Sequence, residues 1–373
     1  MHPTEVHPSI LQLLHTGTVI PAHPLVLNEK RKLDEVRQRR LTRYYMACGA
    51  GGLAVGVHTT QFEIRKPEVN LLETVLKLAA EEIDKAQLNV PFIKIAGIIG
   101  TTSSALREAA LALKYGYHFG LVSLGGLKDY SEAELIKHIH DVSKIIPVVG
   151  FYLQPAVGGR ILSYKFWRDF VEISNVHAIK VAAFNRYQTL DVVRAVCNST
   201  RRNEIALYTG NDDNIVADLL TPYHFTVNGD FIEKRFVGGL LGHWAVWTKK
   251  AVELFNKIKQ SIANDYAGIE MLLAKNMEVT DMNAVIFDAQ NSFHGCIPGI
   301  HEVLRRQGLS EGRWCLNPQE ELSPGQMEEI DRIYEMYPHN TDDAFVKEFL
   351  EKDKNKERQA QLYNQNERET LTE

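Results

Sequence analysis

From about residue 15 to about residue 260, short apolar segments rich in β-branched residues alternate with longer amphipathic segments. Short apolar runs of this kind predict buried strands, and the amphipathic stretches between them predict helices. Eight strand candidates follow one another along this part of the chain. They are residues 17–27, 51–57, 91–99, 119–126, 146–153, 176–184, 204–210 and 224–229.

The helical segments show apolar residues at spacings of three and four. Residues 70–87 are one example, and residues 131–146 are another. The second segment opens with Ser131 and has Glu134 three residues later, which is the signature of a capping box. Eight β-α repeats predict a parallel sheet that closes into a (β/α)₈ TIM barrel. An open doubly wound sheet is the alternative, but no GxGxxG follows the first strand candidate.

The β pattern stops at about residue 260. We therefore expect a barrel over residues 1–260 and a C-terminal helical region over residues 261–345. Residues 346–373 are polar and highly charged, and we expect a frayed or partner-bound tail there.

Composition and charge narrow the class of protein. The 373 residues are 45% hydrophobic and 24% charged, as in ordinary globular chains. A net charge of −5 argues against a nucleic-acid-binding protein. Four widely spaced cysteines form no CxxC pair, and the first residues lack the basic and apolar regions of a signal peptide. We therefore expect a cytoplasmic protein with reduced cysteines and no membrane span.

The segment VHAIKVAAF, residues 176–184, places a lysine inside an otherwise apolar strand candidate. Val176, Ala178, Lys180 and Ala182 share one face of this strand, so small residues flank Lys180. Burial disfavours an ammonium group and lowers its pKa, and a neutral amine can attack a carbonyl to form a Schiff base. The alternative is a lysine that reaches the rim or pairs with a carboxylate.

A tyrosine precedes this lysine in the neighbouring strand candidate. Val148, Gly150 and Tyr152 share one face, and we expect Tyr152 to point into the barrel near its mouth. A phenol there could shuttle protons to and from an imine. The alternative is a core tyrosine whose hydroxyl is satisfied by the backbone.

These motifs resemble those of the pyruvate-dependent class I aldolases and lyases that include dihydrodipicolinate synthase and N-acetylneuraminate lyase. The family has Tyr-Asn-x-Pro on strand five, and this chain has YLQPAVGG from Tyr152. The Schiff-base lysine of the family follows the tyrosine by the same interval that separates Tyr152 from Lys180. By this resemblance Lys180 would attack the keto carbon of pyruvate or another 2-oxo acid, and Tyr152 would relay protons.

The resemblance also implies a binding site for the substrate carboxylate after the second strand. The family has Gly-Thr-Thr-Gly-Glu there, and this chain has GVHTTQFE. Matching threonine to threonine selects Thr59 and Thr60 but needs a one-residue insertion. A gapless match puts His58 in place of the proton-relay threonine and Thr59 in the carboxylate-binding place. Both registers stay open, as does the reading of His58 as a loop residue without a role.

Two further segments compare differently with the family. TGNDD resembles the Ser-Gly-Asp-Asp that often ends strand seven in the family, which implies substrate-binding roles for Gly210, Asn211 and Asp212. In contrast, Val157 stands where dihydrodipicolinate synthase has a carboxylate-binding arginine. A longer segment that contains Asn228, Asp230 and Lys234 replaces the family's strand-eight turn, and we expect those three residues near the mouth. These differences argue against dihydrodipicolinate synthase itself.

The leading hypothesis is therefore a lyase that forms a Schiff base with pyruvate or a 2-oxo acid and needs no cofactor. One alternative is a dehydratase of a sugar-acid-like 2-oxo acid that uses the same imine. Another is a barrel that binds a 2-oxo acid without turnover. A metal-dependent aldolase is disfavoured because His138 and His140, an HxH pair on a predicted helix, do not share a face. The family commonly forms dimers or tetramers, so we expect a homodimer or homotetramer.

Overall fold

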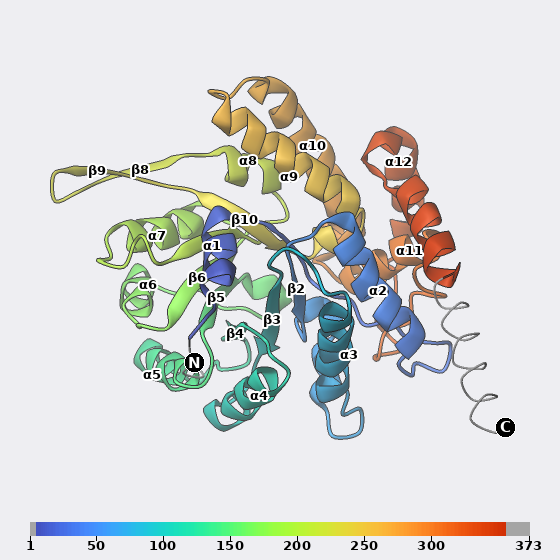
Figure 1. Cartoon of the computed structure of the whole chain (residues 1–373), viewed down its shortest axis with the longest axis horizontal. Coiled ribbons are helices and arrows are strands. Elements are labelled where there is room, and N and C mark those ends of the chain that lie inside the picture. Colours follow the sequence, from blue (N-terminus) through green and yellow to red (C-terminus); the bar gives the residue numbers. More distant parts are fainter. Residues whose placement is uncertain (1–4, 356–373) are drawn as a thin grey trace.

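The chain folds into a parallel β-barrel surrounded by helices, as a computed structural model shows for residues 5–355 (Figure 1). Every neighbouring pair of barrel strands is parallel. The strands follow the order β1-β10-β7-β6-β5-β4-β3-β2. They are β1 (Val19–Pro21), β2 (Gly52–Val55), β3 (Ile93–Ile98), β4 (Phe119–Ser123), β5 (Val148–Leu153), β6 (Val176–Ala182), β7 (Ala206–Thr209) and β10 (Phe236–Leu241).

Contacts between β1 and β2 close the barrel. Ala22 and Ala54 form a parallel bridge, and the backbone N–H of Gly51 donates to the carbonyl of Val19 at 3.2 Å. One helix follows each barrel strand, because a parallel crossover needs a segment of about a dozen residues. These helices are α2 (Glu35–Cys48), α3 (Leu72–Lys85), α4 (Thr102–Lys114), α5 (Glu132–Ser143), α6 (Tyr164–Val171), α7 (Arg186–Cys197), α8 (Ile215–Leu220) and α9 (Thr248–Ala263). The predicted (β/α)₈ barrel is confirmed.

Two buried layers hold this arrangement together. Strand residues that face the helices pack into one apolar cluster, and residues that face the lumen form a second. An additional helix, α1 (Pro8–Thr16), closes the amino end of the barrel by inserting Ile10 and Leu14 into the lumen cluster. The hydroxyl of Tyr208 donates to the carbonyl of Leu14 at 3.0 Å. The lumen is therefore a filled core, and the carboxyl ends of the strands are left for chemistry.

The predicted eighth strand was wrong. Residues 224–229 belong to an antiparallel hairpin of β8 (Tyr223–Val227) and β9 (Asp230–Lys234), which extends from the barrel beside α7 (Figure 1). The eighth barrel strand is β10, whose residues are mostly buried, whereas those of β8 and β9 are mostly exposed or half-buried. The hairpin enters the amino end of β10 and therefore lies away from the mouth.

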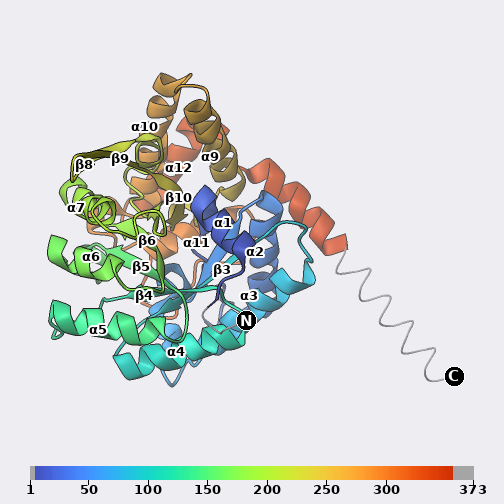
Figure 2. The ribbon, with the colours of Figure 1, turned by 60° about the vertical axis from the view of Figure 1, so that its left-hand side comes forward.

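The C-terminal helices pack beside one sector of the barrel (Figure 2). They are α10 (Ile269–Ile286), α11 (Cys296–Arg306) and α12 (Gln326–Met336). The carboxylate of Asp342 fixes this region, because it accepts hydrogen bonds from the Tyr44 hydroxyl at 2.6 Å and the Lys249 backbone at 3.0 Å. The predicted helical extension is therefore joined to the barrel helices α2 and α9.

The predicted charged tail begins inside the described residues. Residues 343–355 are helical, and Asp353 pairs with Arg40 and Arg43 of α2 at 2.9 and 2.7 Å. The rest of the tail, residues 356–373, lies outside the described part of the chain. Within residues 5–355, every helix is too short or too polar to cross a membrane.

Candidate active site

A cavity of about 60 Å³ lies at the carboxyl ends of the barrel strands, where enzymes of this fold keep their chemistry. It holds roughly four to six water-sized groups, which is the size of a three-carbon keto acid. Its walls come from β5, β6, the loops after β2, β5 and β7, and the segment between α10 and α11. The lining residues are Ala22, Val57, His58, Thr59, Phe151, Leu153, Gln154, Val157, Lys180, Ala182, Phe184, Gly210, Asp212, Gly242, Phe287, Phe293 and Cys296.

Lys180 points into this cavity from β6, as its flanking residues predicted. Ala178 and Ala182 belong to the lumen cluster, so the face that they share with Lys180 is the inner one. The side chain is 7% exposed, and its Nζ lies 4.5 Å from the ring centroid of Phe151 on β5. Within residues 5–355, no group accepts a hydrogen bond from this Nζ. The amine is therefore buried, uncommitted and directed at the cavity.

Burial shifts the pKa values of Lys180 and Asp212 in opposite directions. Loss of hydration lowers the pKa of the Lys180 amine, and the nearby carboxylate of Asp212 partly offsets this. Burial raises the pKa of Asp212, although Oδ1 accepts a hydrogen bond from the His243 backbone at 2.9 Å. Both shifts favour the neutral forms, so an uncharged amine is populated closer to neutral pH than in a free lysine.

The loop after β2 places one histidine and one threonine at the cavity. His58 and Thr59 begin the short helix η1 (His58–Thr60), and both line the cavity. Burial and the charge of Lys180 lower the pKa of His58 to about 4, so its imidazole is neutral at pH 7. Thr59 is 3% exposed, and its hydroxyl has no hydrogen-bond partner among the described residues. Such an unsatisfied buried hydroxyl is costly unless a ligand pairs with it.

Thr60 has a structural role instead. Its hydroxyl donates to the carbonyl of His23 at 2.7 Å and accepts from the backbones of Gly56 and Val57 at 3.0 and 3.2 Å. These bonds fix the turn that presents His58 and Thr59, and they leave Thr60 out of the cavity lining. The arrangement is consistent with the gapless register.

In the predicted Gly210-Asn211-Asp212 segment, too, only some of the residues face the cavity. Gly210 and Asp212 line the cavity, and a Cβ at Gly210 would lie 2.5 Å from Cε of Lys180. The side chain of Asn211 turns away, since its oxygen accepts from the Phe184 backbone at 2.9 Å and its amide donates to Asp218 at 2.9 Å. Asn211 therefore shapes the loop without facing the cavity.

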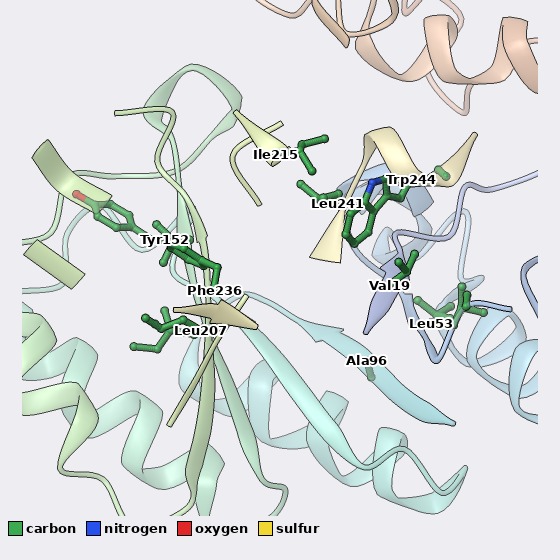
Figure 3. Close-up of a cluster of buried hydrophobic side chains, with 14 of the residues drawn as sticks. Val19, Leu53, Ala96, Tyr152, Leu207, Ile215, Phe236, Leu241 and Trp244 are labelled. Atoms are coloured by element: carbon green, nitrogen blue, oxygen red, sulfur yellow. The ribbon is translucent and has the colours of Figure 1, made fainter. Parts of the chain in front are cut away.

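The expectation that Tyr152 points into the lumen was wrong. Tyr152 faces the helices, with its ring 5.0 Å from that of Trp167 and its hydroxyl bonded to the Leu162 backbone. Figure 3 shows it in the buried cluster that also contains Leu207 and Phe236. The inward face of β5 belongs to Val149, Phe151 and Leu153, so a phenyl ring stands opposite Lys180.

This orientation yields a prediction for Tyr152→Phe. The Tyr152 hydroxyl makes long hydrogen bonds of 3.3 and 3.5 Å to the Leu162 backbone. It lies on the face of β5 that is turned away from the lumen and from Lys180. We expect a loss of about 1 kcal/mol in unfolding free energy. The rate at which pyruvate labels Lys180 under borohydride should stay within about twofold of wild type. A loss of labelling by orders of magnitude would instead indicate that Tyr152 takes part in proton transfer.

The segment between α10 and α11 was not expected at the site. Phe287, Phe293 and Cys296 cover the mouth, and Asp288, Ser292 and Phe293 have left-handed backbone conformations. The carboxylate of Asp288 fixes this segment, because it accepts hydrogen bonds from the Gly295 backbone at 2.9 Å and the Ser323 hydroxyl at 2.5 Å. No sequence motif marked the segment, because its residues are ordinary apolar and polar types in a helical region.

A second cavity of about 330 Å³ lies against the first and shares His58, Val157 and Phe293 with it. It is wider and more open to solvent, and its lining includes Glu63, Glu320 and His294. We call the two the inner cavity and the outer cavity. A larger cavity of about 590 Å³ lies between α8, α9 and α10, but none of the predicted site residues lines it.

Asn228, Asp230 and Lys234 are absent from both cavities, which corrects their expected position near the mouth. Lys234 instead donates to the carbonyl of Arg202 at 2.5 Å. The HxH pair is separated too, because His138 is buried and bonded to Thr102 at 2.9 Å while His140 is exposed. In the described part of the chain, no three histidine, cysteine or acidic residues form a group that could hold a metal ion.

Comparisons with known proteins concern the sequence and the fold of the chain. No family model matches the chain. The N-acetylneuraminate lyase of Citrobacter koseri is 28% identical over 205 residues, which cover 54% of this chain and 65% of the relative. That of Salmonella typhi is 26% identical over 196 residues, 52% of this chain and 62% of the relative. The chain thus spans somewhat less than two thirds of the length of the curated relatives it matches.

Solved structures share the fold over a longer stretch. A dihydrodipicolinate synthase from Oceanobacillus iheyensis superposes with a TM-score of 0.69 at 14% identity, over 88% of this chain and 99% of that one. An N-acetylneuraminate lyase from Fusobacterium nucleatum gives 0.66 at 17% identity, over 87% and 99%. In its sequence and its fold the chain therefore resembles the family of dihydrodipicolinate synthase and N-acetylneuraminate lyase, as its motifs predicted.

Proposed function

We propose that this protein is a class I aldolase or lyase that forms a Schiff base between Lys180 and pyruvate or another 2-oxo acid. The observation that carries the proposal is the buried Lys180 amine, which faces a cavity of keto-acid size and bonds to no described residue. Its lowered pKa supplies the neutral nucleophile that imine formation requires. The curated relatives are named N-acetylneuraminate lyase, and one solved neighbour from Fusobacterium nucleatum is complexed with pyruvate.

The reaction proceeds through an imine. The nitrogen lone pair of Lys180 forms a bond to the keto carbon, and the keto oxygen leaves as water after two proton transfers. The bond between the carbons α and β to the former keto carbon then breaks, and its electron pair flows into the protonated imine to give an enamine. A base removes the proton of the substrate hydroxyl, and an aldehyde is released. The enamine is protonated on carbon, and water hydrolyses the imine to return Lys180 and the keto acid.

We assign the proton transfers to His58 and the carboxylate contact to Thr59. Phe151 stands opposite Lys180 and cannot move a proton, whereas His58 lines the inner cavity and is neutral at pH 7. A neutral imidazole can accept the hydroxyl proton and return it. The unpaired hydroxyl of Thr59 can donate to the substrate carboxylate, which would satisfy it.

Borohydride trapping tests the proposal. The protein is incubated with pyruvate and sodium borohydride, digested, and analysed by mass spectrometry. A reduced pyruvyl adduct on Lys180 is expected. Failure to label Lys180 under conditions in which the protein is folded would overturn the imine mechanism.

The threonine pair gives a matched prediction. Thr59→Val removes a hydrogen bond to a charged group worth about 1.5–3 kcal/mol, so the KM for the 2-oxo acid should rise about ten- to hundredfold. Thr60→Val should instead lower the free energy of unfolding by about 1–3 kcal/mol, because it unpairs the backbones of Gly56 and Val57. Steady-state kinetics and thermal unfolding separate the two effects. Equal KM changes in both variants would mean that Thr59 makes no specific contact with the substrate carboxylate.

A second candidate function is binding of a 2-oxo acid without turnover. It is favoured by Phe151, which fills the place beside Lys180 where the family motif led us to expect a phenol. Adduct formation on Lys180 together with an absence of aldehyde release from any 2-oxo acid tested would support this candidate. Stabilisation by 2-oxo acids without an adduct would support it too.

A further inference from the structure

We propose that the outer cavity binds a positively charged group of the substrate, so that the aldehyde half released or condensed at Lys180 carries an ammonium group. The inference rests on the proposed function for its reaction, but the charge of the cavity can be tested without turnover. Its basis is a pair of carboxylates, Glu63 and Glu320, that line the outer cavity and have no cationic partner within the described chain.

The two carboxylates come from distant parts of the sequence. Glu63 lies on η2 (Phe62–Arg65) after β2, and Glu320 lies between α11 and α12. Both are half-buried, and the negative charge of Glu63 adds to burial in raising the pKa of Glu320. The two groups are thus close enough to repel each other, and neither forms an ion pair with a lysine or arginine among residues 5–355.

Other half-buried carboxylates in the described chain have a partner of some kind. Glu108 pairs with Arg65 at 2.8 Å, and the carboxylate of Glu132 accepts hydrogen bonds from the backbone and hydroxyl of Ser163. Neither Glu63 nor Glu320 has a side-chain hydrogen bond or ion pair to any residue from 5 to 355. His294 lies near Glu320, but its side chain is exposed and makes no ion pair with either carboxylate within residues 5–355.

An independent feature indicates that the connected cavities hold a ligand. The Thr59 hydroxyl is buried, faces the inner cavity and has no partner in the described chain. The inner cavity accommodates only a keto-acid-sized group. The outer cavity adjoins it, because His58, Val157 and Phe293 line both cavities. A substrate joined to Lys180 would therefore extend its remaining atoms toward Glu63 and Glu320.

The charge of the outer cavity decides which substrates fit. A second carboxylate would meet two like charges, whereas an ammonium group would relieve their mutual repulsion. A neutral hydroxylated aldehyde can donate hydrogen bonds to both carboxylates but leaves the repulsion in place. The geometry thus favours an amino aldehyde, such as an amino sugar, over a neutral sugar, and a neutral sugar over a uronic acid.

Sugars that differ only in charge test this order. Mannosamine, mannose and mannuronate form one series, and glucosamine, glucose and glucuronate form another. Their binding to the full chain without pyruvate is measured by calorimetry, and their condensation with pyruvate is measured as kcat/KM. An ammonium-bearing member should exceed its neutral partner about tenfold, which is the low end of the gain from a hydrogen bond to a charged group. The uronates should bind more weakly than either.

Two variants identify the source of the preference. In the double variant Glu63→Gln, Glu320→Gln, the preference should fall to about onefold, because the charges are gone while the shape remains. Glu321→Gln is the matched control, since Glu321 pairs with Arg313 at 2.6 Å and lines neither cavity, and it should keep the preference. Borohydride labelling of Lys180 with pyruvate should be unchanged in Glu321→Gln.

The outcomes separate the two proposals. If no ammonium-bearing sugar binds more tightly than its neutral partner, or if the preference survives in the double variant, the outer cavity is not a cation site. If the calorimetric preference is found but wild-type Lys180 is never labelled, the cation site stands and the Schiff-base function fails.

Discussion

Replacing Lys180 with methionine should abolish labelling by pyruvate and borohydride and, at the same time, make the folded protein more stable. Labelling is lost because the methionine thioether cannot form an imine, so activity should fall to background. Stability should rise because a buried ammonium is replaced by an apolar side chain of similar length. Loss of labelling together with a gain in stability is the pattern expected of a group that is buried for function at a cost to the fold.

The sign of the stability change follows from the pKa of Lys180. Burial lowers this pKa in the folded state below the ordinary value of about 10.5. Between the folded pKa and about 10.5 the unfolded chain binds more protons, so wild-type stability rises with pH in that window. The protonated amine therefore destabilises the fold most at neutral pH. The gain from methionine should be on the order of 1–3 kcal/mol at pH 7 and should shrink toward pH 10.5.

Two further measurements test the assignment: the pKa of Asp212 in Lys180→Met, and the labelling of a control variant at a second lysine. Without Lys180, the carboxylate of Asp212 loses a favourable charge, so its pKa should rise further and the neutral acid should predominate. Lys234→Met is the matched control, because Lys234 is half-buried and its pKa is also lowered by loss of hydration, to about 8, but it lies on the hairpin away from both cavities. That variant should keep full labelling. An adduct in Lys180→Met, or a loss of stability there at pH 7, would contradict the assignment.

The fold could be predicted from the sequence because barrel strands are buried on both faces and read as apolar runs. Seven of the eight candidates contain a barrel strand for this reason. The eighth failed because residues 224–229 form the more conspicuous β signal, with an Asn-Gly turn at Asn228 and Gly229 that is typical of a hairpin. The real strand, β10, has two glycines and two leucines among its six residues, and its glycines admit the close packing of Tyr208 and Trp244.

The site was predicted where a chemical group breaks an apolar pattern and was missed where it does not. Lys180 stood out in a strand of small residues, and its inward face was inferred correctly. β5 reads Val-Val-Gly-Phe-Tyr-Leu, which is apolar on both faces, so alternation separates its two faces without indicating which is inward. Packing decides the question, because a Cβ at Gly150 would meet the Phe170 ring at 2.5 Å, and that face must therefore turn toward α6.

Replacing Gly210 with alanine should lower the rate of pyruvate labelling by about a hundredfold or more, as expected for a catalytic group displaced by about 1 Å. The added Cβ would lie 2.5 Å from Cε and 3.0 Å from Cγ of Lys180, and 2.9 Å from the Ala182 side chain. Gly210 does not have a left-handed backbone, so alanine is tolerated by the main chain. The hydrogen bond from its N–H to the Val181 carbonyl, 2.7 Å long, is also retained. The lysine must therefore move.

A double variant identifies which contact is responsible. Ala182→Gly in the Gly210→Ala background removes the contact with Ala182 but leaves the contacts with Lys180. If displacement of Lys180 is the cause, labelling should remain low in the double variant, and thermal unfolding should show a folded protein in both. Recovery of wild-type labelling would mean that the strand backbone, rather than the lysine, had been displaced. Labelling of Gly210→Ala within about threefold of wild type would mean that the amine does not act from this rotamer, because a reacting group tolerates little displacement.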